Sequence, residues 1–124
     1  MTVHVRIAPS PTGLFHIGTA RTALFNYVFA KQKKGHFLLR IDDTDAQRSE
    51  KRFEEDIKQS LSWLGIIWDS SFRQSDHNTL YRTHLEKLYG EKKIFRCPHT
   101  TDELAKERNE QMQNKEALRH ICSY

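Results

Sequence analysis

The sequence has only two cysteines, Cys97 and Cys122, and no long apolar run. Two cysteines cannot form the framework of a disulfide-rich secreted domain. No stretch approaches the roughly 20 apolar residues that are needed to cross a membrane. The first ten residues, MTVHVRIAPS, lack the apolar core of a signal peptide. We therefore expect a cytoplasmic protein with no membrane partner.

Two common nucleotide-binding patterns are also missing. Neither the phosphate-binding loop GxxxxGK[ST] nor the dinucleotide pattern GxGxxG occurs in the 124 residues. The charge is only weakly one-sided, with 20 Lys and Arg against 16 Asp and Glu, for a net charge of +4. This excess is compatible with an anionic partner, although many proteins without one carry a similar charge. The length suits about one domain.

The beginning of the chain has the pattern of an α/β fold. Residues 3–8 alternate in polarity and are rich in β-branched side chains, which predicts a strand that ends at Pro9. A stiff turn over residues 9–13 leads to a helix that begins near Ile17. Residues 37–41 form a short apolar run that is typical of a buried strand. Strand, turn, helix and strand in this order form the βαβ unit of a parallel sheet.

The spacing of apolar residues predicts how the helices are packed and where they end. The first helix is expected to bury Ala20, Leu24, Tyr27 and Val28, and to be capped by Gly35. Ser49 is expected to cap a helix over residues 50–64 that ends at Gly65. The remaining expectations are an irregular segment over 66–78, a helix over 79–92, a brief strand over 94–96 and a polar helix over 101–114.

The stretch APSPTGLFHIGT, residues 8–19, is expected to connect the first strand to the first helix. In parallel sheets ligands bind beyond the carboxyl ends of the strands, and a helix N-terminus there favours an anion. His16 can donate a hydrogen bond to a phosphate oxygen, and Gly18 has no Cβ to block a flat ring. The alternative is an ordinary turn beside a surface histidine. The expected nucleotide-binding residues are Pro11, Thr12, Gly13, His16 and Gly18.

The longer segment RIAPSPTGLFHIGTARTALFN resembles the signature region of class I aminoacyl-tRNA synthetases. More narrowly, it is similar to that of the bacterial-type glutamyl-tRNA synthetases. HIGT stands where that class has its His-Ile-Gly-His motif, and LLRIDDTDAQRS resembles the second block of the family. LSWLGIIWD and RQSD follow in the order of the family, so the resemblance spans nearly the whole chain.

The resemblance implies a reaction and a division of the chain. Glutamate would attack the α-phosphorus of ATP, which is bound with Mg²⁺, and the glutamyl group would pass to the 3′ end of tRNA(Glu). Residues 1–96 would form the first half of the Rossmann-like catalytic domain, and residues 97–124 would begin the inserted acceptor-binding domain. The implied catalytic residues are His16, Gly18 and Thr19, and the implied glutamate-binding residues are Arg6, Ala8, Ser10 and Asp42.

Asp42 departs from the family pattern, which has a glutamate that meets the ammonium group of the substrate. The aspartate keeps the charge but is one methylene shorter, so a bridging water is one way to restore the contact. The alternative is a solvated loop carboxylate or a helix cap.

The C-terminal part holds a candidate metal site. Cys97 and His99 form a C-x-H pair, and His120 and Cys122 form an H-x-C pair. Four nitrogen and sulfur ligands suit tetrahedral zinc. Some glutamyl-tRNA synthetases have two zinc-binding cysteines where Cys97 and His99 stand, and a tyrosine that can bind metal where His120 stands, whereas Cys122 matches no usual ligand. The alternative is two unrelated cysteines and two surface histidines.

The second signature of the class, Lys-Met-Ser-Lys-Ser, does not occur in the sequence. We therefore expect the isolated chain to be inactive, and the open edge of its sheet to favour self-association or marginal stability. The parent protein is expected to be a monomer. The alternatives are a glutamyl-Q tRNA(Asp) synthetase and a truncated, non-catalytic paralogue that binds nucleotide or tRNA. A nucleotidyltransferase is a weaker alternative because it does not explain RIDDTDAQRS.

Overall fold

The computed structural model describes residues 2–120 and residue 122, which form two compact units. The first unit ends at Tyr81 and the second begins at Arg82. In chain order the elements are β1 (His4–Ile7), α1 (Ile17–Gln32), β2 (His36–Ile41), α2 (Lys51–Trp63), β3 (Ser70–Arg73), the 3-10 turn η1 (Ser75–His77), α3 (Asn78–Gly90) and α4 (Thr101–Gln113). No helix among the described residues has the length and apolar character that a membrane crossing requires.

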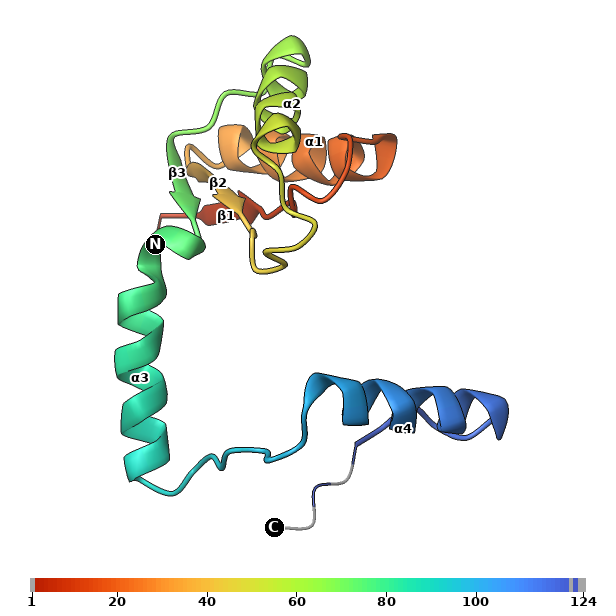
Figure 1. Cartoon of the computed structure of the whole chain (residues 1–124). Coiled ribbons are helices and arrows are strands. Elements are labelled where there is room, and N and C mark those ends of the chain that lie inside the picture. Colours follow the sequence, from red (N-terminus) through yellow and green to blue (C-terminus); the bar gives the residue numbers. More distant parts are fainter. Residues whose placement is uncertain (1, 121, 123–124) are drawn as a thin grey trace. The chain divides into compact units, whose positions relative to one another are not determined.

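The first unit is a parallel sheet of three strands in the order β1-β2-β3, so the α/β expectation is confirmed. Helices α1 and α2 lie on one side of this sheet (Figure 1). The core between sheet and helices contains Ile7, Ala23, Ala30, Phe37, Leu39, Ile41, Ile57, Leu61 and Ile66. On the other side of the sheet Arg6, Leu38 and Ser70 line an open hollow of about 370 Å³.

Helix α1 is turned differently from the sequence expectation. Ala23 and Ala30 are buried against the sheet, whereas the expected core residues Leu24 and Val28 are 49% and 44% exposed. Apolar side chains occur on more than one side of this helix, so their spacing does not select the buried side. Small side chains let the helix approach the sheet closely, and of the expected residues Tyr27 does pack against the core.

Gly35 does not cap α1 through its own backbone conformation, so that expectation was wrong. Lys34 adopts the positive φ of 49° after the helix, and the N–H of Gly35 donates to the carbonyl of Ala30 at 2.8 Å. Gly35 is instead required by close packing, because a Cβ there would lie 2.4 Å from the carbonyl oxygen of Val3. Gly65, with a φ of 72°, does end α2 as expected.

The start of α2 also differs from the expectation. Glu50, and not Ser49, occupies the cap position, and its side chain makes no capping hydrogen bond. The helix is fixed to the sheet by Glu54, which is only 6% exposed. Its carboxylate binds Lys58 of the same helix and Arg73 of β3.

Strand β3 was missed, because residues 66–78 were expected to be irregular. Its four residues include two exposed serines and lack the apolar alternation of a strand. The strand is held by backbone pairing with β2, and Asp69 closes its start by accepting the N–H of Phe37 at 2.8 Å. A lone sequence gives little signal for a polar strand at the edge of a sheet.

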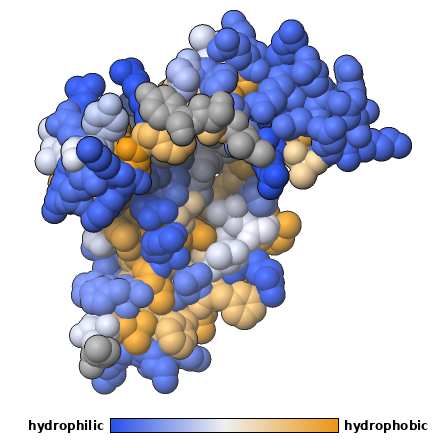
Figure 2. All heavy atoms as spheres, turned by 90° about the horizontal axis from the view of Figure 1, so that it is seen from below, coloured by the Kyte–Doolittle hydropathy of each residue, from blue (hydrophilic) through white to orange (hydrophobic). Residues whose placement is uncertain are grey.

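The helices after the sheet are confirmed close to their expected bounds, whereas residues 94–96 form no strand. Helix α4 is mostly hydrophilic on the face that Figure 2 shows, and none of its residues is buried. The compact units divide within α3, so the functional boundary at residues 96 and 97 stays a prediction.

Candidate functional site

The loop between β1 and α1 is held in place by hydrogen bonds to later parts of the first unit. The three contacts are Asp42 N–H to the carbonyl of Pro9 (3.0 Å), Glu50 N–H to the carbonyl of Pro11 (2.9 Å) and Phe15 N–H to Asp56 Oδ2 (2.7 Å). The loop therefore has a defined position relative to the end of β2 and the start of α2. The bond from Phe15 to Asp56 also fixes the chain two residues before α1 begins.

This loop borders a hollow of about 260 Å³ at the carboxyl end of β1. Of the residues that the sequence singles out, the hollow is lined by Ser10, Thr12, Gly13, His16 and Thr19. Pro11 lines a separate hollow with Asp43 and Arg73, and Arg6 lines the hollow on the open side of the sheet. The structure thus brings together most of the loop residues, but it places Arg6 and Pro11 on other surfaces.

His16 is the N-cap residue of α1. Its Nδ1 accepts the N–H of Gly18 at 3.2 Å, and its Nε2 lies 3.2 Å from the hydroxyl of Thr19. Because Nδ1 is the acceptor, a neutral ring carries its proton on Nε2 and donates it to Thr19. The imidazole is therefore presented at the helix N-terminus with its N–H directed at a group that a ligand can replace.

A side chain at position 18 would crowd this arrangement. A Cβ at this position would lie 3.0 Å from Cε1 and 3.1 Å from Nδ1 of His16. The absence of a side chain at position 18 thus makes room for the ring of His16 itself.

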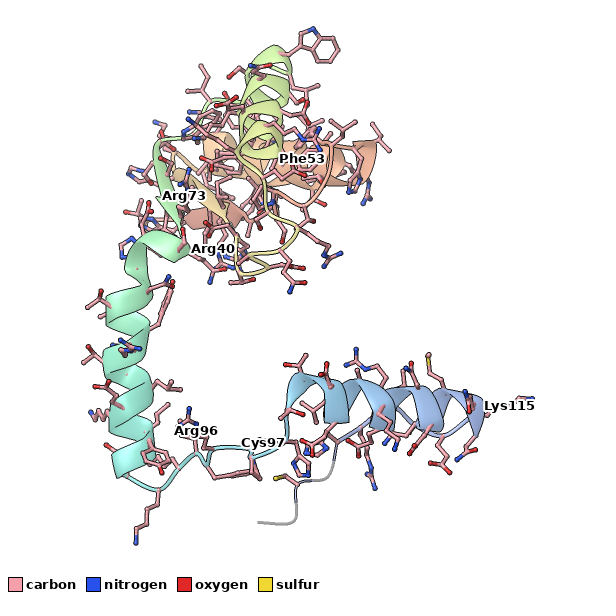
Figure 3. The ribbon with its side chains drawn as sticks, viewed as in Figure 1. Arg40, Phe53, Arg73, Arg96, Cys97 and Lys115 are labelled. Atoms are coloured by element: carbon pink, nitrogen blue, oxygen red, sulfur yellow. The ribbon has the colours of Figure 1, made fainter. Side chains whose placement is uncertain are left out.

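Asp42 is engaged by a neighbour that the sequence pattern did not single out. Arg40 (labelled in Figure 3) binds it through two hydrogen bonds, Nε to Oδ1 at 2.6 Å and a terminal nitrogen to Oδ2 at 2.8 Å. Hydrogen bonding to Asp42 raises the pKa of Arg40 above its ordinary value. The sequence feature that could have identified this pair is the Arg-x-Asp spacing at the end of a strand, which puts both side chains on the same side of the extended chain.

The second unit gathers the four candidate metal ligands. Their ligand atoms all lie within 4.8 Å of one another. The Sγ of Cys97 (labelled in Figure 3) is 3.3 Å from Nδ1 of His99 and 3.6 Å from Nε2 of His120. The Sγ of Cys122 is 3.9 Å from Nδ1 of His99. Two residue pairs that are 23 positions apart in the chain therefore form one cluster.

The electrostatics of the cluster favour a thiolate at Cys97. Hydrogen bonds from the backbone N–H and the ring of His99 are the main causes that lower the pKa of Cys97 to about 7. Desolvation raises the pKa of Cys122 above its ordinary value. A hydrogen bond to Glu107 raises the pKa of His120. Glu107 was not singled out from the sequence, because nothing in its spacing relates it to the two pairs.

Comparison with known proteins gives one family for the chain. The model of the family "tRNA synthetases class I (E and Q), catalytic domain" matches residues 2–122. The glutamate–tRNA ligase 1 of Maricaulis maris is 48% identical over 110 residues, which are 89% of this chain and 25% of that protein. The glutamate–tRNA ligase of Aquifex aeolicus is 49% identical over 108 residues, which are 87% of this chain and 23% of that protein.

Solved structures give the same result. The glutamate–tRNA synthetase of Elizabethkingia anophelis superimposes with a TM-score of 0.80 at 37% identity, over 94% of this chain and 26% of the other. A glutamate–tRNA ligase of Elizabethkingia meningosepticum, in complex with its amino acid, gives a TM-score of 0.79 at 37% identity, over 94% and 25%. The chain spans about a quarter of the length of the relatives that it matches.

Proposed function

The chain belongs to the catalytic-domain family of the class I tRNA synthetases for glutamate and glutamine, and from this premise we propose that it is the N-terminal part of a glutamate–tRNA ligase. In the reaction, a carboxylate oxygen of glutamate attacks the α-phosphorus of ATP, and pyrophosphate leaves. The glutamyl group then passes from AMP to a hydroxyl at the 3′ end of tRNA(Glu). The observation that carries the proposal is the imidazole of His16 at the mouth of α1, beside a hollow at the carboxyl end of β1.

The residues around this hollow have distinct proposed roles. The Nε2–H of His16, which donates to Thr19 in the free chain, donates instead to a phosphate oxygen as charge develops on it. The N-terminus of α1 adds backbone N–H groups and a partial positive charge for the same anion. Gly18 keeps the approach to the helix open for the adenine ring. ATP itself supplies the leaving group and is bound with Mg²⁺.

Glutamate is proposed to bind next to this phosphate site. Arg6, which lines the hollow on the open side of the sheet, would meet the substrate carboxylate from that side, since a guanidinium offers two parallel donors. Ala8 and Ser10 are proposed to line the glutamate-binding pocket. Asp42 attracts the substrate ammonium with the lone pairs that Arg40 leaves unoccupied, directly or through a water molecule.

The cluster in the second unit is proposed to hold one structural zinc ion. Two thiolates and two neutral imidazoles are a donor set that zinc prefers, and they fill a tetrahedral shell without an open position. The four ligand atoms already lie within 4.8 Å of one another, so the residues fit the ion. Zinc held by Cys97, His99, His120 and Cys122 fixes the segments on both sides of α4 and takes part in no chemical step.

A binding measurement and an activity measurement test the ligase proposal together. We expect a non-hydrolysable glutamyl-adenylate analogue to bind this chain more tightly than the glutaminyl analogue, and to shift the amide resonances of residues 9–19. We expect no pyrophosphate exchange into ATP with glutamate and tRNA(Glu) present, because the second signature loop does not occur in these residues. Preference for the glutaminyl analogue would overturn the amino-acid assignment, and exchange above background would overturn the proposed inactivity.

A further inference from the structure

The first pair of metal ligands is held at the start of α4 by a helix cap. Thr100 directly follows His99, and its Oγ1 accepts the N–H of Glu103 at 3.3 Å. The carboxylate of Glu103 in turn accepts the N–H of Thr100 at 2.7 Å. This capping box fixes the direction in which the chain enters the helix, directly after His99.

The second pair returns along the same helix. Lys115 adopts a positive φ of 57° after α4, so the chain reverses there (Figure 3). The side chain of Gln111 then donates to the carbonyl of Arg119 at 2.8 Å. Gln111 and Glu107 are four residues apart and face the same side of α4. The returning segment therefore brings His120 beside Glu107.

Glu107 binds the ring of His120 on the side away from the cluster. Its Oε2 lies 2.6 Å from Nδ1 of His120, whereas Nε2 of the same ring lies 3.6 Å from Sγ of Cys97. An ionised carboxylate only accepts hydrogen bonds, so the proton of the ring is on Nδ1. The lone pair of the neutral ring is then on Nε2, which faces the thiols.

We propose that Glu107 is a positioning residue for the metal centre, which selects the tautomer and the orientation in which His120 binds zinc through Nε2. The inference rests on the zinc proposal above. A carboxylate that accepts the second N–H of a metal-bound histidine fixes the ring and makes it a stronger ligand. Helix α4 thus contributes to the centre from outside the set of four ligands.

Glu107→Ala, Glu107→Gln and the matched control Glu110→Gln test the proposal in the full 124-residue chain. Glu110 is exposed on the same helix and has the same charge as Glu107. Zinc affinity is measured by competition with a chromogenic chelator, and the ligand field is measured from the visible spectrum of the cobalt-loaded chain. We expect Glu107→Ala to lower the zinc affinity about 10- to 100-fold. Glu107→Gln keeps an acceptor oxygen and should lower it less, and Glu110→Gln should not change it.

A readout without metal separates this inference from the zinc proposal. Nitrogen-15 spectra of the metal-free chain should show His120 protonated on Nδ1, and Glu107→Ala should move the proton toward Nε2. If the wild-type chain binds zinc and Glu107→Ala changes neither affinity nor tautomer, Glu107 has no positioning role. If the wild-type chain binds neither zinc nor cobalt, the metal centre itself is overturned, and the role of Glu107 with it.

Discussion

Arg40 binds Asp42 through two hydrogen bonds of 2.6 and 2.8 Å at the carboxyl end of β2. Both side chains are less than one-third exposed, whereas Arg48, which makes the same 2.6 Å contact with Asp45, is 73% exposed. The Asp42 carboxylate is therefore first a structural partner of Arg40, and any substrate contact uses its remaining lone pairs.

The stability of the first unit should depend on this pair. We expect Asp42→Asn to lower the free energy of unfolding by about 1–2 kcal/mol, because a charge-assisted hydrogen bond is lost. Asp45→Asn should change it by less than about 0.5 kcal/mol, because an exposed pair contributes little. Urea unfolding followed by tryptophan fluorescence measures both, because Trp68 packs against the core whereas Trp63 is exposed. A loss of stability in Asp42→Asn no larger than that in Asp45→Asn would mean that the Arg40–Asp42 pair stabilises the fold no more than an exposed pair does.

Gly35 should tolerate no side chain. A Cβ would lie 2.4 Å from the carbonyl oxygen of Val3, and neither group can move without shifting β1. We expect Gly35→Ala to lower the free energy of unfolding by about 1–3 kcal/mol. Gly13→Ala is the control within the same unit, since a Cβ there meets nothing within 4 Å. The free energy of unfolding of Gly13→Ala should stay within about 0.5 kcal/mol of the wild-type value. A harmless Gly35→Ala would contradict the close approach of Val3, directly before β1, to Gly35.

Glu54 should make the stability of the first unit dependent on acid. Burial alone would raise the pKa of Glu54, but its hydrogen bonds to Arg73 and Lys58 outweigh that effect and lower the pKa below its ordinary value of 4.5. Because the folded-state pKa is depressed, the stabilisation is complete above pH 4.5 and is lost as the pH falls through the folded-state value.

We expect Glu54→Gln to be less stable than the wild type by about 1–2 kcal/mol at neutral pH. The difference between the two should shrink as the pH is lowered below 4.5. Urea unfolding at a series of pH values measures it. Asp43 and Asp69 also have lowered pKa values, so the comparison uses the difference and not the wild-type curve alone. A difference that does not change with pH would show that Glu54 stabilises the fold by packing and not by charge.

The sequence predicts the elements where one local pattern dominates. Alternation gives β1, and the apolar run gives β2. The loop chemistry at Pro9 and Gly13 gives the position of His16. The sequence does not predict β3, since two serines in a four-residue edge strand leave pairing with β2 as its main support. The buried side of α1 was also missed, because Leu24 and Val28 have the spacing of core residues and the close packing of Ala23 leaves no mark on that spacing.

The candidate metal centre divides in the same way. The C-x-H and H-x-C spacings by themselves identify its four residues. Glu107 is not identified, because its contact with His120 depends on the chain reversal after α4. Contacts that depend on how two segments fold back on each other leave no pattern in a single sequence.

Removal of the proposed zinc ion should loosen the second unit and leave the first unchanged. All four candidate ligands lie after Tyr81, and structural zinc contributes folding free energy directly. Metal analysis of chain purified without a histidine tag should give about one zinc per chain, and Cys97→Ser should abolish it. Hydrogen exchange should then become faster over residues 97–120, but not over β1–β3. A metal-free chain with full protection around α4 would mean that the cluster needs no ion.

His16 has a structural task and a proposed chemical one, and two substitutions separate them. As the N-cap of α1 it accepts the N–H of Gly18. Serine can do the same, so we expect His16→Ser to stay within about 0.5 kcal/mol of wild-type stability, and His16→Ala to lose about 1 kcal/mol.

Neither variant can donate from an imidazole to phosphate. Both variants should therefore bind the glutamyl-adenylate analogue about tenfold or more weakly, which is the scale of a hydrogen bond to a charged group. Calorimetric titration measures the affinity, and His84→Ala, an exposed histidine of α3, is the control. If His16→Ser bound the analogue as tightly as the wild type, His16 would be a helix cap only, and the phosphate site would have to rest on the backbone N–H groups of α1.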